Sequence, residues 1–450
     1  MEYYPHDYQK RAIKFVIDNP KSSLLLQPGL GKTSISLSAV EYLINSLEVS
    51  KVLIVAPVRV ASMTWSDEAK KWSHLSSLKV SRLIGSPAQR IKAINTKADI
   101  YTISTGNLAW LVHYAIKTWK KWPYDFLIID ESSMFRNPSS MRFKALKKVA
   151  PLSSRVTILT GTFVPNGLLG AFGQMYLLDQ GKRLGRTFTE YKDRYFKPGQ
   201  RQGHVIFSWS LKEGADQQIY DAISDISLSM ETKDYLDLPP RIDQFEMLEL
   251  ENKERYDEFK KTEVLQLSDD YELTPVSAAA MYSKLVQFSN GCVYKDDGTY
   301  EVVDNTKLLA LCDDVVELNG EPVLIGYLFR SDYERIIKEI PHAVKLDSDA
   351  TIARWNKGEI AVAVAQYQSV SHGINLQFGG YNMRLFGLPW DLETLIQFIA
   401  RMDRQGITRP VVCKYYLGKG TIEELIKERL EGKAKTQDSL MAALKKELSL

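Results

Sequence analysis

The sequence contains few cysteines and lacks long apolar runs, and these two scarcities exclude several classes of protein. The three cysteines, Cys292, Cys312 and Cys413, are widely separated in 450 residues, which argues against a disulfide framework and against paired metal-ligand spacing. No stretch approaches the roughly 20 apolar residues that span a bilayer, and the first residues do not resemble a secretory signal. We therefore expect a cytoplasmic protein with reduced, buried thiols and no membrane partner.

A strong net charge is also missing. The 58 Lys and Arg residues nearly balance the 55 Asp and Glu residues, for a net charge of +3. This charge is too small to attract a polyanion through the global field, so any nucleic-acid site has to be a local basic surface. The 44% hydrophobic content is that of a globular protein, and the length predicts two or three domains.

Short apolar segments alternate with amphipathic ones at both ends of the chain, which predicts parallel sheets covered by helices. The first set of strands is expected at residues 22–26, 51–56, 99–104, 126–130 and 155–160. The second set is expected at residues 321–329, 342–347, 359–367, 382–390 and 410–417. The predicted fold class is thus α/β, with one lobe over 1–169, a helical insertion and linker over 170–295, and a second lobe over 296–450.

Residues 181–201 within the predicted insertion are rich in Lys and Arg, interleaved with Phe and Tyr. Such a mixture can hold a phosphate backbone while the rings stack on bases. A solvated insertion whose aromatic residues belong to the core explains the same composition equally well. The sequence leaves both interpretations open.

The sharpest motif is QPGLGKT at residues 27–33, between a predicted strand and a predicted helix. Glycines let successive backbone N–H groups point at phosphate oxygens, and the helix amino terminus adds positive potential. Lys32 is expected to reach the β and γ phosphates, and the Thr33 hydroxyl to ligate Mg²⁺. The motif is a shortened variant, because Leu26 occupies the place of the first glycine. ATP and Mg²⁺ are therefore the predicted cofactors, held by Pro28, Gly29, Leu30, Gly31, Lys32 and Thr33.

A second motif, FLIIDESS, places Asp130 and Glu131 directly after an apolar strand. Asp130 suits a magnesium or water ligand, and Glu131 is placed to orient and polarise the attacking water. A solvated turn is the simpler explanation of a carboxylate pair alone. Its position about one hundred residues after a phosphate loop, in the same sheet pattern, favours a catalytic role.

A third motif, QFIARMDRQG, carries two arginines near the end of the chain. Gln397, Arg401 and Arg404 share one face if the segment is helical. Such a face can present both arginines to a γ-phosphate held by the other lobe and neutralise charge in the transition state. Arg401 and Arg404 are therefore predicted catalytic residues.

Together these motifs resemble the superfamily 2 helicase-type ATPases, and most of all the Swi/Snf-related double-stranded DNA translocases. The resemblance covers nearly the whole chain, with further blocks in the family's order at HDYQKRA, LIVAPVRVASMTWSDEAKKW, LTGTFVPNGLLGAFGQMYLLDQG, SVSHGINL and KGTIEELI. It implies two RecA-like lobes that close on ATP and step along one strand of a duplex with 3′ to 5′ polarity. It also implies nucleotide contacts from Gln9, Gly373, Asn375 and Gln397. The implied DNA contacts are Arg59, Ser104, Thr105, Thr162, Asn166, Arg330 and Trp390.

The chain departs from the family pattern at several positions. Gln27 and Pro28 stand where the family has an acidic residue and methionine, and Ser133 replaces the histidine of the DEAH box. The family has a basic RRTK stretch before an LPP motif. This chain has LPP at residues 238–240, but SMETK at residues 229–233 stands in place of the basic stretch. Coupling between ATP and DNA is expected to differ at these positions.

The leading hypothesis is a DNA-dependent ATPase that translocates on double-stranded DNA and remodels or displaces what is bound there. Single-stranded DNA is a possible further partner, and a monomeric motor is expected in the cytoplasm of a bacterial or virus-infected bacterial cell. A strand-separating DNA helicase is the first alternative, because the same motor separates strands when a wedge is added. An ATP-clamped nucleic-acid-binding module that does not hydrolyse ATP is the second.

Overall fold

The chain folds into two compact units, Met1–Leu236 and Asp237–Leu450. Residues of the predicted insertion, 170–295, fall in both of them. Within the part of the chain that is described, no helix is both long and apolar enough to cross a bilayer. The computed structural model describes residues 1–161, 163, 167–199, 201–202, 205–206, 209–235, 238–268, 275–370 and 374–431.

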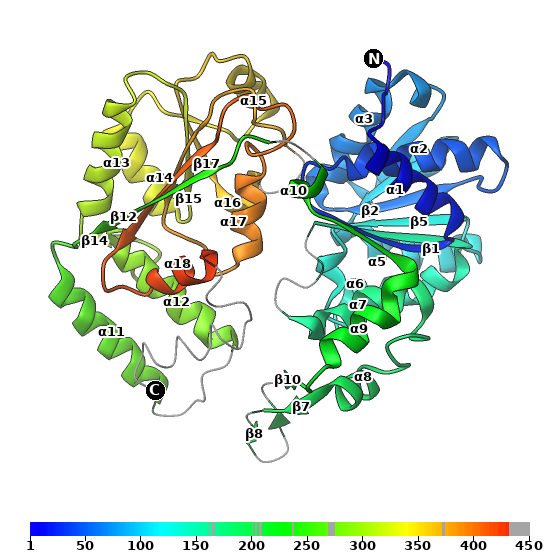
Figure 1. Cartoon of the computed structure of the whole chain (residues 1–450), viewed down its shortest axis with the longest axis horizontal. Coiled ribbons are helices and arrows are strands. Elements are labelled where there is room, and N and C mark those ends of the chain that lie inside the picture. The colour runs from blue at the N-terminus through cyan, green and yellow to red at the C-terminus, as the bar shows by residue number, and fades with distance from the viewer. Residues whose placement is uncertain are drawn as a thin grey trace. The chain divides into compact units, whose positions relative to one another are not determined.

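The first unit is built on a seven-stranded parallel sheet with the order β11-β1-β6-β5-β2-β4-β3 (Figure 1). The five strands that the sequence predicts are present, whereas β3 and β11 were not predicted. The strands are β1 Lys21–Leu26, β2 Val52–Ala56, β3 Val80–Leu83, β4 Ile100–Ser104, β5 Phe126–Asp130, β6 Arg155–Thr160 and β11 Ser227–Met230. The helices are α1 Asp7–Asp18, α2 Lys32–Asn45, α3 Trp65–Lys71, α4 Pro87–Ile94, α5 Leu108–Tyr114, α6 Met141–Val149, α7 Ala171–Asp179, α8 Phe188–Tyr195, α9 Ala215–Ile223 and α10 Thr232–Tyr235.

Helices cover both faces of this sheet, with α1 and α2 on one face and α5, α6 and α7 on the other (Figure 1). The central strands are therefore buried along their whole length, as in β2, β4 and β5. Strands enclosed in this way need apolar side chains on both faces, which explains continuous runs such as VLIVA and FLIID. For this reason the apolar pattern of the sequence predicts the central strands.

The basic, aromatic segment 181–201 contributes its rings to the core of the first unit. Tyr191, Tyr195 and Phe196 are buried in the same apolar cluster as strand residues of the sheet. Arg183 is held by ion pairs to Asp179 and Asp225. The described part of this segment therefore fits the interpretation in which the aromatic side chains are core residues.

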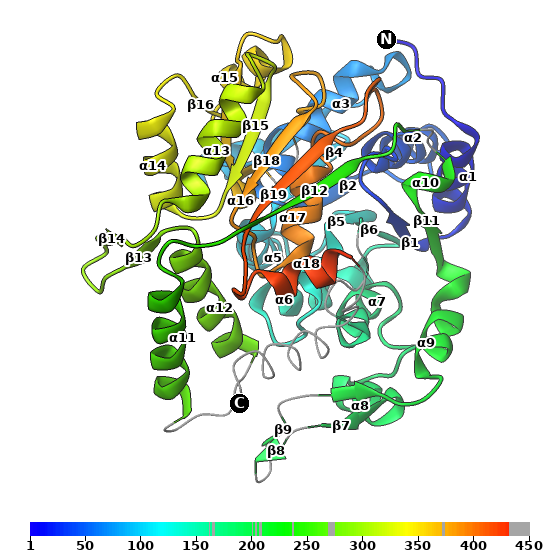
Figure 2. The same cartoon turned by 60° about the vertical axis from the view of Figure 1, so that its left-hand side comes forward.

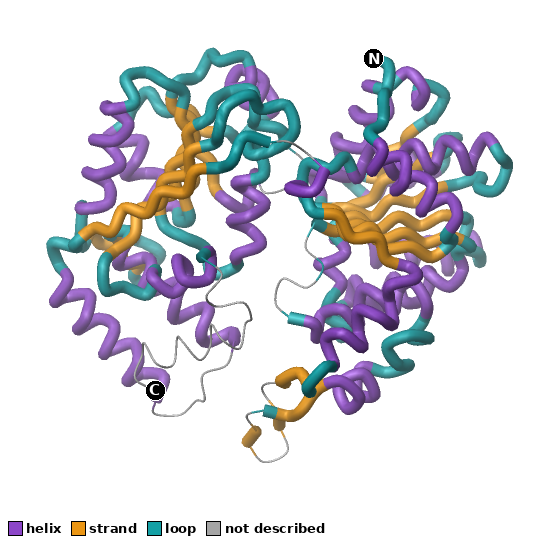
Figure 3. The backbone as a smooth tube through the Cα atoms, in the orientation of Figure 1, coloured by secondary structure: helices purple, strands orange, loops and turns teal. Residues whose placement is uncertain are grey.

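The second unit has a six-stranded parallel sheet with the order β12-β19-β18-β15-β17-β16 (Figure 3). All five predicted strands are present, and β12 is an additional edge strand. The strands are β12 Ile242–Leu248, β15 Val323–Tyr327, β16 Val344–Lys345, β17 Val362–Gln366, β18 Asn382–Phe386 and β19 Val412–Gly418. The helices are α11 Lys253–Ser268, α12 Pro275–Ser289, α13 Thr306–Glu317, α14 Arg330–Glu339, α15 Asp349–Asn356, α16 Tyr367–Val370, α17 Leu392–Ile399 and α18 Glu424–Leu430. Helices α11 and α12 form a hairpin beside the small antiparallel pair β13 Cys292–Tyr294 and β14 Tyr300–Val302 (Figure 2).

Strand residues of the second unit alternate between two apolar cores, as the pleat of a strand requires. Val323, Ile325 and Tyr327 pack with α13 and α14, whereas Leu324 packs in the larger core that includes Phe398. Both faces of β15 are thus buried. The α/β fold class that the sequence predicts, with two parallel sheets covered by helices, is confirmed.

A buried ion pair joins helix α13 to the segment before α18. Lys307 Nζ donates to a carboxylate oxygen of Glu423, and both side chains are almost completely excluded from solvent, at 1% and 0% exposure. Lys307 also donates to Asn290 Oδ1 at 3.1 Å, and Glu423 accepts from the Gly418 amide at 3.0 Å. Because removal of one partner leaves an uncompensated buried charge, each partner depends on the other.

We expect Lys307→Met to destabilise the second unit by about 3–5 kcal/mol, and Lys307→Met combined with Glu423→Leu to recover much of that loss. Urea denaturation measures both. The control is Lys419→Met, which breaks an exposed pair with Glu249 and should leave the free energy of unfolding almost unchanged. Equal losses for Lys307→Met and Lys419→Met would contradict the assigned role of the buried pair.

Candidate active site

Three sequence motifs lie at the carboxyl ends of three neighbouring parallel strands, β1, β6 and β5. The register pairs Leu25 with Thr160 and Asp130 with Leu159, so the three strands end at nearly the same level. A Cβ added at Gly161 would lie 3.1 Å from Pro28 Cδ and 3.4 Å from Lys32 Nζ. The phosphate loop, the carboxylate pair and the start of the TGT segment (residues 160–162), at Thr160 and Gly161, therefore meet at one edge of the sheet.

Two glycines shape the phosphate loop between β1 and α2. Gly29 and Gly31 have φ values of 93° and 80°, in the left-handed region that favours glycine. Gly31 is the N-cap of α2, so Lys32 and Thr33 stand in the first turn, where backbone amides lack partners within the helix. Lys32 Nζ donates to the Leu26 carbonyl at 2.9 Å, which folds the side chain back over the loop. This geometry is suited to an anion such as a phosphate.

Gln9 of helix α1 packs directly against the phosphate loop. Its Nε2 donates to the Leu30 carbonyl at 3.4 Å, and its Oε1 accepts from the His6 amide at 3.0 Å. A Cβ on Gly31 would approach Gln9 Nε2 to 2.6 Å, so a side chain at that position would displace the amide. The structure brings the predicted nucleotide residue Gln9 together with the loop.

Asp130 ends β5 as a nearly buried carboxylate. The pKa of Asp130 is raised to about 7, mainly because the carboxylate is buried. The adjacent Glu131 charge contributes to this rise, and the Lys32 charge opposes it. Trp65 Nε1 donates to Asp130 Oδ2 at 3.2 Å, and the Glu131 amide donates to Oδ1 at 3.0 Å. Both carboxylate oxygens of Asp130 thus accept a hydrogen bond, which fixes the orientation of the side chain.

Glu131 has a strained backbone and an unsatisfied side chain. Its φ of 52° lies in the left-handed region, which is uncommon for residues other than glycine, and strain of this kind tends to occur at functional sites. Its Oε2 is buried and has no hydrogen-bond partner among the described residues. An unsatisfied carboxylate oxygen next to Asp130, at the same sheet edge as the phosphate loop that includes Thr33, offers oxygen ligands of the kind that Mg²⁺ prefers. The residues fit the two predicted cofactors.

The predicted DNA-binding residues of the first unit lie at the carboxyl ends of β2 and β4. These strands are neighbours, and Ala56 pairs with Ser104. Arg59 follows β2 and is half-buried, whereas Ser104 and Thr105 are buried. Thr162 and Asn166 lie outside the described residues.

In the second unit, predicted residues follow β15, β17 and β18, which are adjacent strands. Arg330 begins α14, where its side chain is 62% exposed and contacts Glu334. Trp390 is half-buried, with its ring 5.0 Å from that of Tyr282. Gly373, between β17 and β18, lies outside the described residues.

The predicted helix through both arginines is wrong, because α17 ends at Ile399. The Leu376 amide donates to the Arg401 carbonyl at 2.9 Å, which takes the backbone out of the helix. Arg401 Nε donates back to the Gln397 carbonyl at 3.1 Å, as basic side chains near helix carboxyl ends often do, and Arg404 donates to Asn375 Oδ1. The arginine motif and the Asn375 segment are thus joined by tertiary contacts.

Sequence reasoning missed three residues at this site. The first is Trp65, whose indole Nε1 donates to Asp130. Ser132 and Gln174 are buried and bonded to each other at 2.7 Å. A buried polar residue in the apolar run of α7 was the available signal for Gln174.

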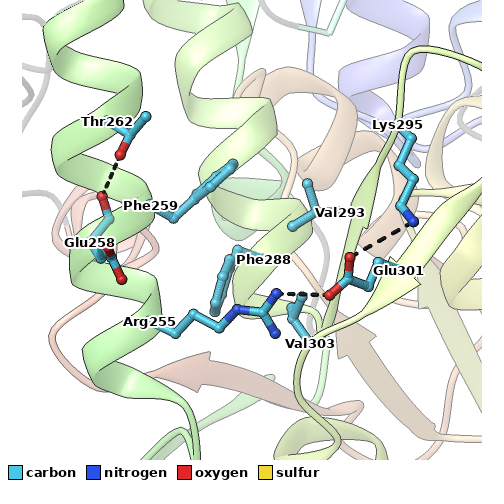
Figure 4. A pocket seen from close by; sticks show the side chains of 9 residues that line it. All are labelled: Arg255, Glu258, Phe259, Thr262, Phe288, Val293, Lys295, Glu301 and Val303. Carbon is cyan, nitrogen blue, oxygen red and sulfur yellow. Dashed lines mark hydrogen bonds and ion pairs between the residues drawn. The ribbon is translucent and has the colours of Figure 1, made fainter.

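Each unit contains a cavity lined by described residues. A cavity of about 500 Å³ beside the phosphate loop is lined by Gln27, Gly161 and the segment Ser229–Glu231, so two departures from the family pattern meet there. A second cavity, of about 320 Å³, lies among α11, α12, β13 and β14 (Figure 4). Arg255 and Lys295 both face Glu301 at its rim, and its described lining includes no predicted site residue.

We expect Asp130→Asn to stabilise the protein in magnesium-free buffer above pH 7 by about 2–4 kcal/mol. The folded-state pKa, near 7, lies above the ordinary value of 3.8, so the native state binds more protons between these values. Wild-type stability should therefore fall as the pH rises from about 4 to 7, and the variant should lose this slope. Urea titrations across that range measure the difference, and parallel profiles would contradict the assignment.

Comparisons with known proteins agree with the geometry. The family model of the SNF2-related domain matches residues 8–287. The chain is 36% identical to protein p41 of Acyrthosiphon pisum secondary endosymbiont phage 1, over 99% of both chains. It is 24% identical to the DNA annealing helicase and endonuclease ZRANB3 of Bos taurus, over 98% of this chain and 41% of that longer protein.

A solved structure of the Sulfolobus solfataricus SWI2/SNF2 ATPase core in complex with dsDNA is similar at a TM-score of 0.47 and 21% identity, over 96% of this chain and 92% of that one. The family match spans more than half of the chain, and its motifs converge in the first unit. The chain therefore belongs to the SNF2-related family of superfamily 2 helicase-type ATPases.

Proposed function

We propose that this protein is a DNA-dependent ATPase that translocates on double-stranded DNA and remodels or displaces what is bound there. The observation that carries the proposal is the convergence of Lys32, Asp130 and Glu131 at neighbouring strand ends. Family membership supports ATP use, and the DNA-acting relative ZRANB3 supports a DNA substrate.

In this proposal the first unit binds ATP and activates water. The loop amides and Lys32 hold the β and γ phosphates, while Thr33 and Asp130 hold Mg²⁺ directly or through water. Bound Mg²⁺ supplies charge neutralisation at the phosphoryl oxygens. Glu131 orients the attacking water with its unsatisfied carboxylate oxygen, and Gln9 reads the base. The raised pKa of Asp130 makes it responsive to the arrival of a cation.

The arginine motif is the contribution of the second unit to the proposed reaction. Arg401 and Arg404 neutralise charge on the γ-phosphoryl group, as arginine fingers do. Asn375 positions Arg404 through the hydrogen bond between them, and Gln397 and Gly373 are the remaining proposed nucleotide contacts. The turn after α17 supports this role, because side chains in a turn can reorient at less cost than side chains within a helix.

Arg59, Ser104, Thr105, Arg330 and Trp390 are the proposed DNA contacts among described residues. They follow strands β2, β4, β15 and β18, where loops of parallel sheets carry ligands. The exposed guanidinium of Arg330 suits a phosphate, whereas the buried hydroxyls of Ser104 and Thr105 leave their backbone amides as the better donors. Such contacts hold the backbone without reading sequence.

We expect Glu131→Gln to reduce ATP turnover by about 10²–10⁴-fold and to keep nucleotide affinity within about twofold. The amide keeps the shape of the side chain but cannot accept the proton of the attacking water. Steady-state hydrolysis and binding of a fluorescent ATP analogue measure the two quantities. The matched control is Glu213→Gln, an exposed position of the same unit. A Glu131→Gln enzyme with wild-type turnover would remove Glu131 from the mechanism.

We expect duplex DNA to stimulate ATP hydrolysis more strongly than single-stranded DNA or RNA, when the three are compared at equal nucleotide concentration and fixed salt. Displacement of a third strand from a triplex reports translocation, and a labelled fork reports strand separation. Triplex displacement without fork opening is the expected pattern. Fork opening without triplex displacement would favour the strand-separating helicase, and no stimulation by any nucleic acid would exclude the proposed function.

A further inference from the structure

Gln174 is a buried polar residue in a helix that is enclosed almost completely by apolar neighbours. Helix α7 buries eight of its nine residues, and Gln174 is only 1% exposed. An unpaired amide at this depth is unfavourable, so its partners decide whether it is tolerated. Both the oxygen and the nitrogen of the Gln174 amide make hydrogen bonds.

The two ends of the Gln174 amide connect two motif segments. Its Oε1 accepts from the Ser132 hydroxyl at 2.7 Å, and its Nε2 donates to the Phe163 carbonyl at 2.6 Å. Ser132 is the residue after Glu131 and is itself 0% exposed. Phe163 belongs to the TGTF segment that follows β6. The Gln174 amide therefore bridges two segments, the one that carries the proposed general base Glu131 and the TGT segment.

A close helix approach holds Gln174 in this position. A Cβ on Gly173 would lie 2.4 Å from the Phe135 carbonyl oxygen and 2.9 Å from that of Arg136, so only glycine permits this contact. The atoms that exclude a larger residue at position 173 belong to the backbone and not to flexible side chains. Helix α7 is thereby seated on the short helix Ser132–Phe135, directly after the strained Glu131 backbone.

We propose that Gln174 is a positioning residue that couples the Glu131 segment to the TGT segment through Ser132. This inference rests on the proposed function, since it concerns how DNA contact is linked to hydrolysis. A displacement of the Phe163 carbonyl moves the amide, and the amide is bonded to the neighbour of Glu131. The buried hydrogen bonds resist stretching because no water replaces them at this depth. An apolar side chain would fill the same space but would break the connection.

The test compares Gln174→Met, Ser132→Ala and their double variant with the wild type. Methionine has nearly the length of glutamine and keeps the packing, but it removes both hydrogen bonds. The matched control is Met175→Leu, a volume-conserving change at the next, fully buried position of α7. For each protein we would measure the ratio of duplex-stimulated to unstimulated ATP hydrolysis, KM for ATP, the melting temperature and amide hydrogen exchange over residues 126–136.

The proposal predicts that the stimulation ratio falls about tenfold in Gln174→Met and in Ser132→Ala, while KM for ATP changes less than about twofold. The double variant should lose no more than the worse single variant, because both break one pathway. Amide exchange over 126–136 should rise in both single variants, and Met175→Leu should keep the wild-type ratio.

Other results overturn the proposal in distinguishable ways. A lowered melting temperature with a wild-type stimulation ratio would show that Gln174 only supports packing, and the proposed function would stand. Losses that add fully in the double variant would show that Ser132 and Gln174 act separately. A wild-type protein that duplex DNA does not stimulate would remove the proposed function and this inference together.

Discussion

The parallel adjacency of β1, β6 and β5 is the constraint on which the rest of the site depends. Side chains from residues about one hundred positions apart in sequence become neighbours because each strand ends at the same edge of one sheet. The phosphate loop, the TGT segment and the carboxylate pair need no long side chains to meet. A shift of one register step in β6 would move Gly161 away from Pro28 and Lys32 of the loop.

Close packing and a buried carboxylate occur together at this edge. Glycines at 31, 161 and 173 leave room for close neighbours, which are Gln9, Pro28 and the Phe135 carbonyl. Asp130 is buried with a raised pKa, and the Oε2 atom of the half-buried Glu131 has no hydrogen-bond partner among the described residues. Such a site is satisfied by a bound cation and phosphate, which the proposed reaction provides.

The second unit uses polar contacts differently. Arg401 donates to the Gln397 and Ile374 carbonyls, and Arg404 donates to Asn375. The Lys307–Glu423 pair lies in the buried interior, where one carboxylate oxygen of Glu423 accepts from both Lys307 and the Gly418 amide. The contacts of Arg401 and Arg404 suit residues that meet an incoming ligand. The buried Lys307–Glu423 pair suits a fixed part of the structure.

The sequence by itself determined the two α/β sheets, the phosphate loop and the Asp130–Glu131 pair, because buried parallel strands and glycine-rich turns have strong local signatures. It did not determine β11 and β12, since edge strands lack a continuous apolar pattern and their partners are distant in sequence. The end of α17 was also decided by a tertiary hydrogen bond to Leu376, which helical periodicity does not encode. Only the folded structure joined Gln174 to Ser132, because a hydrogen bond between residues 42 positions apart depends on how α7 packs.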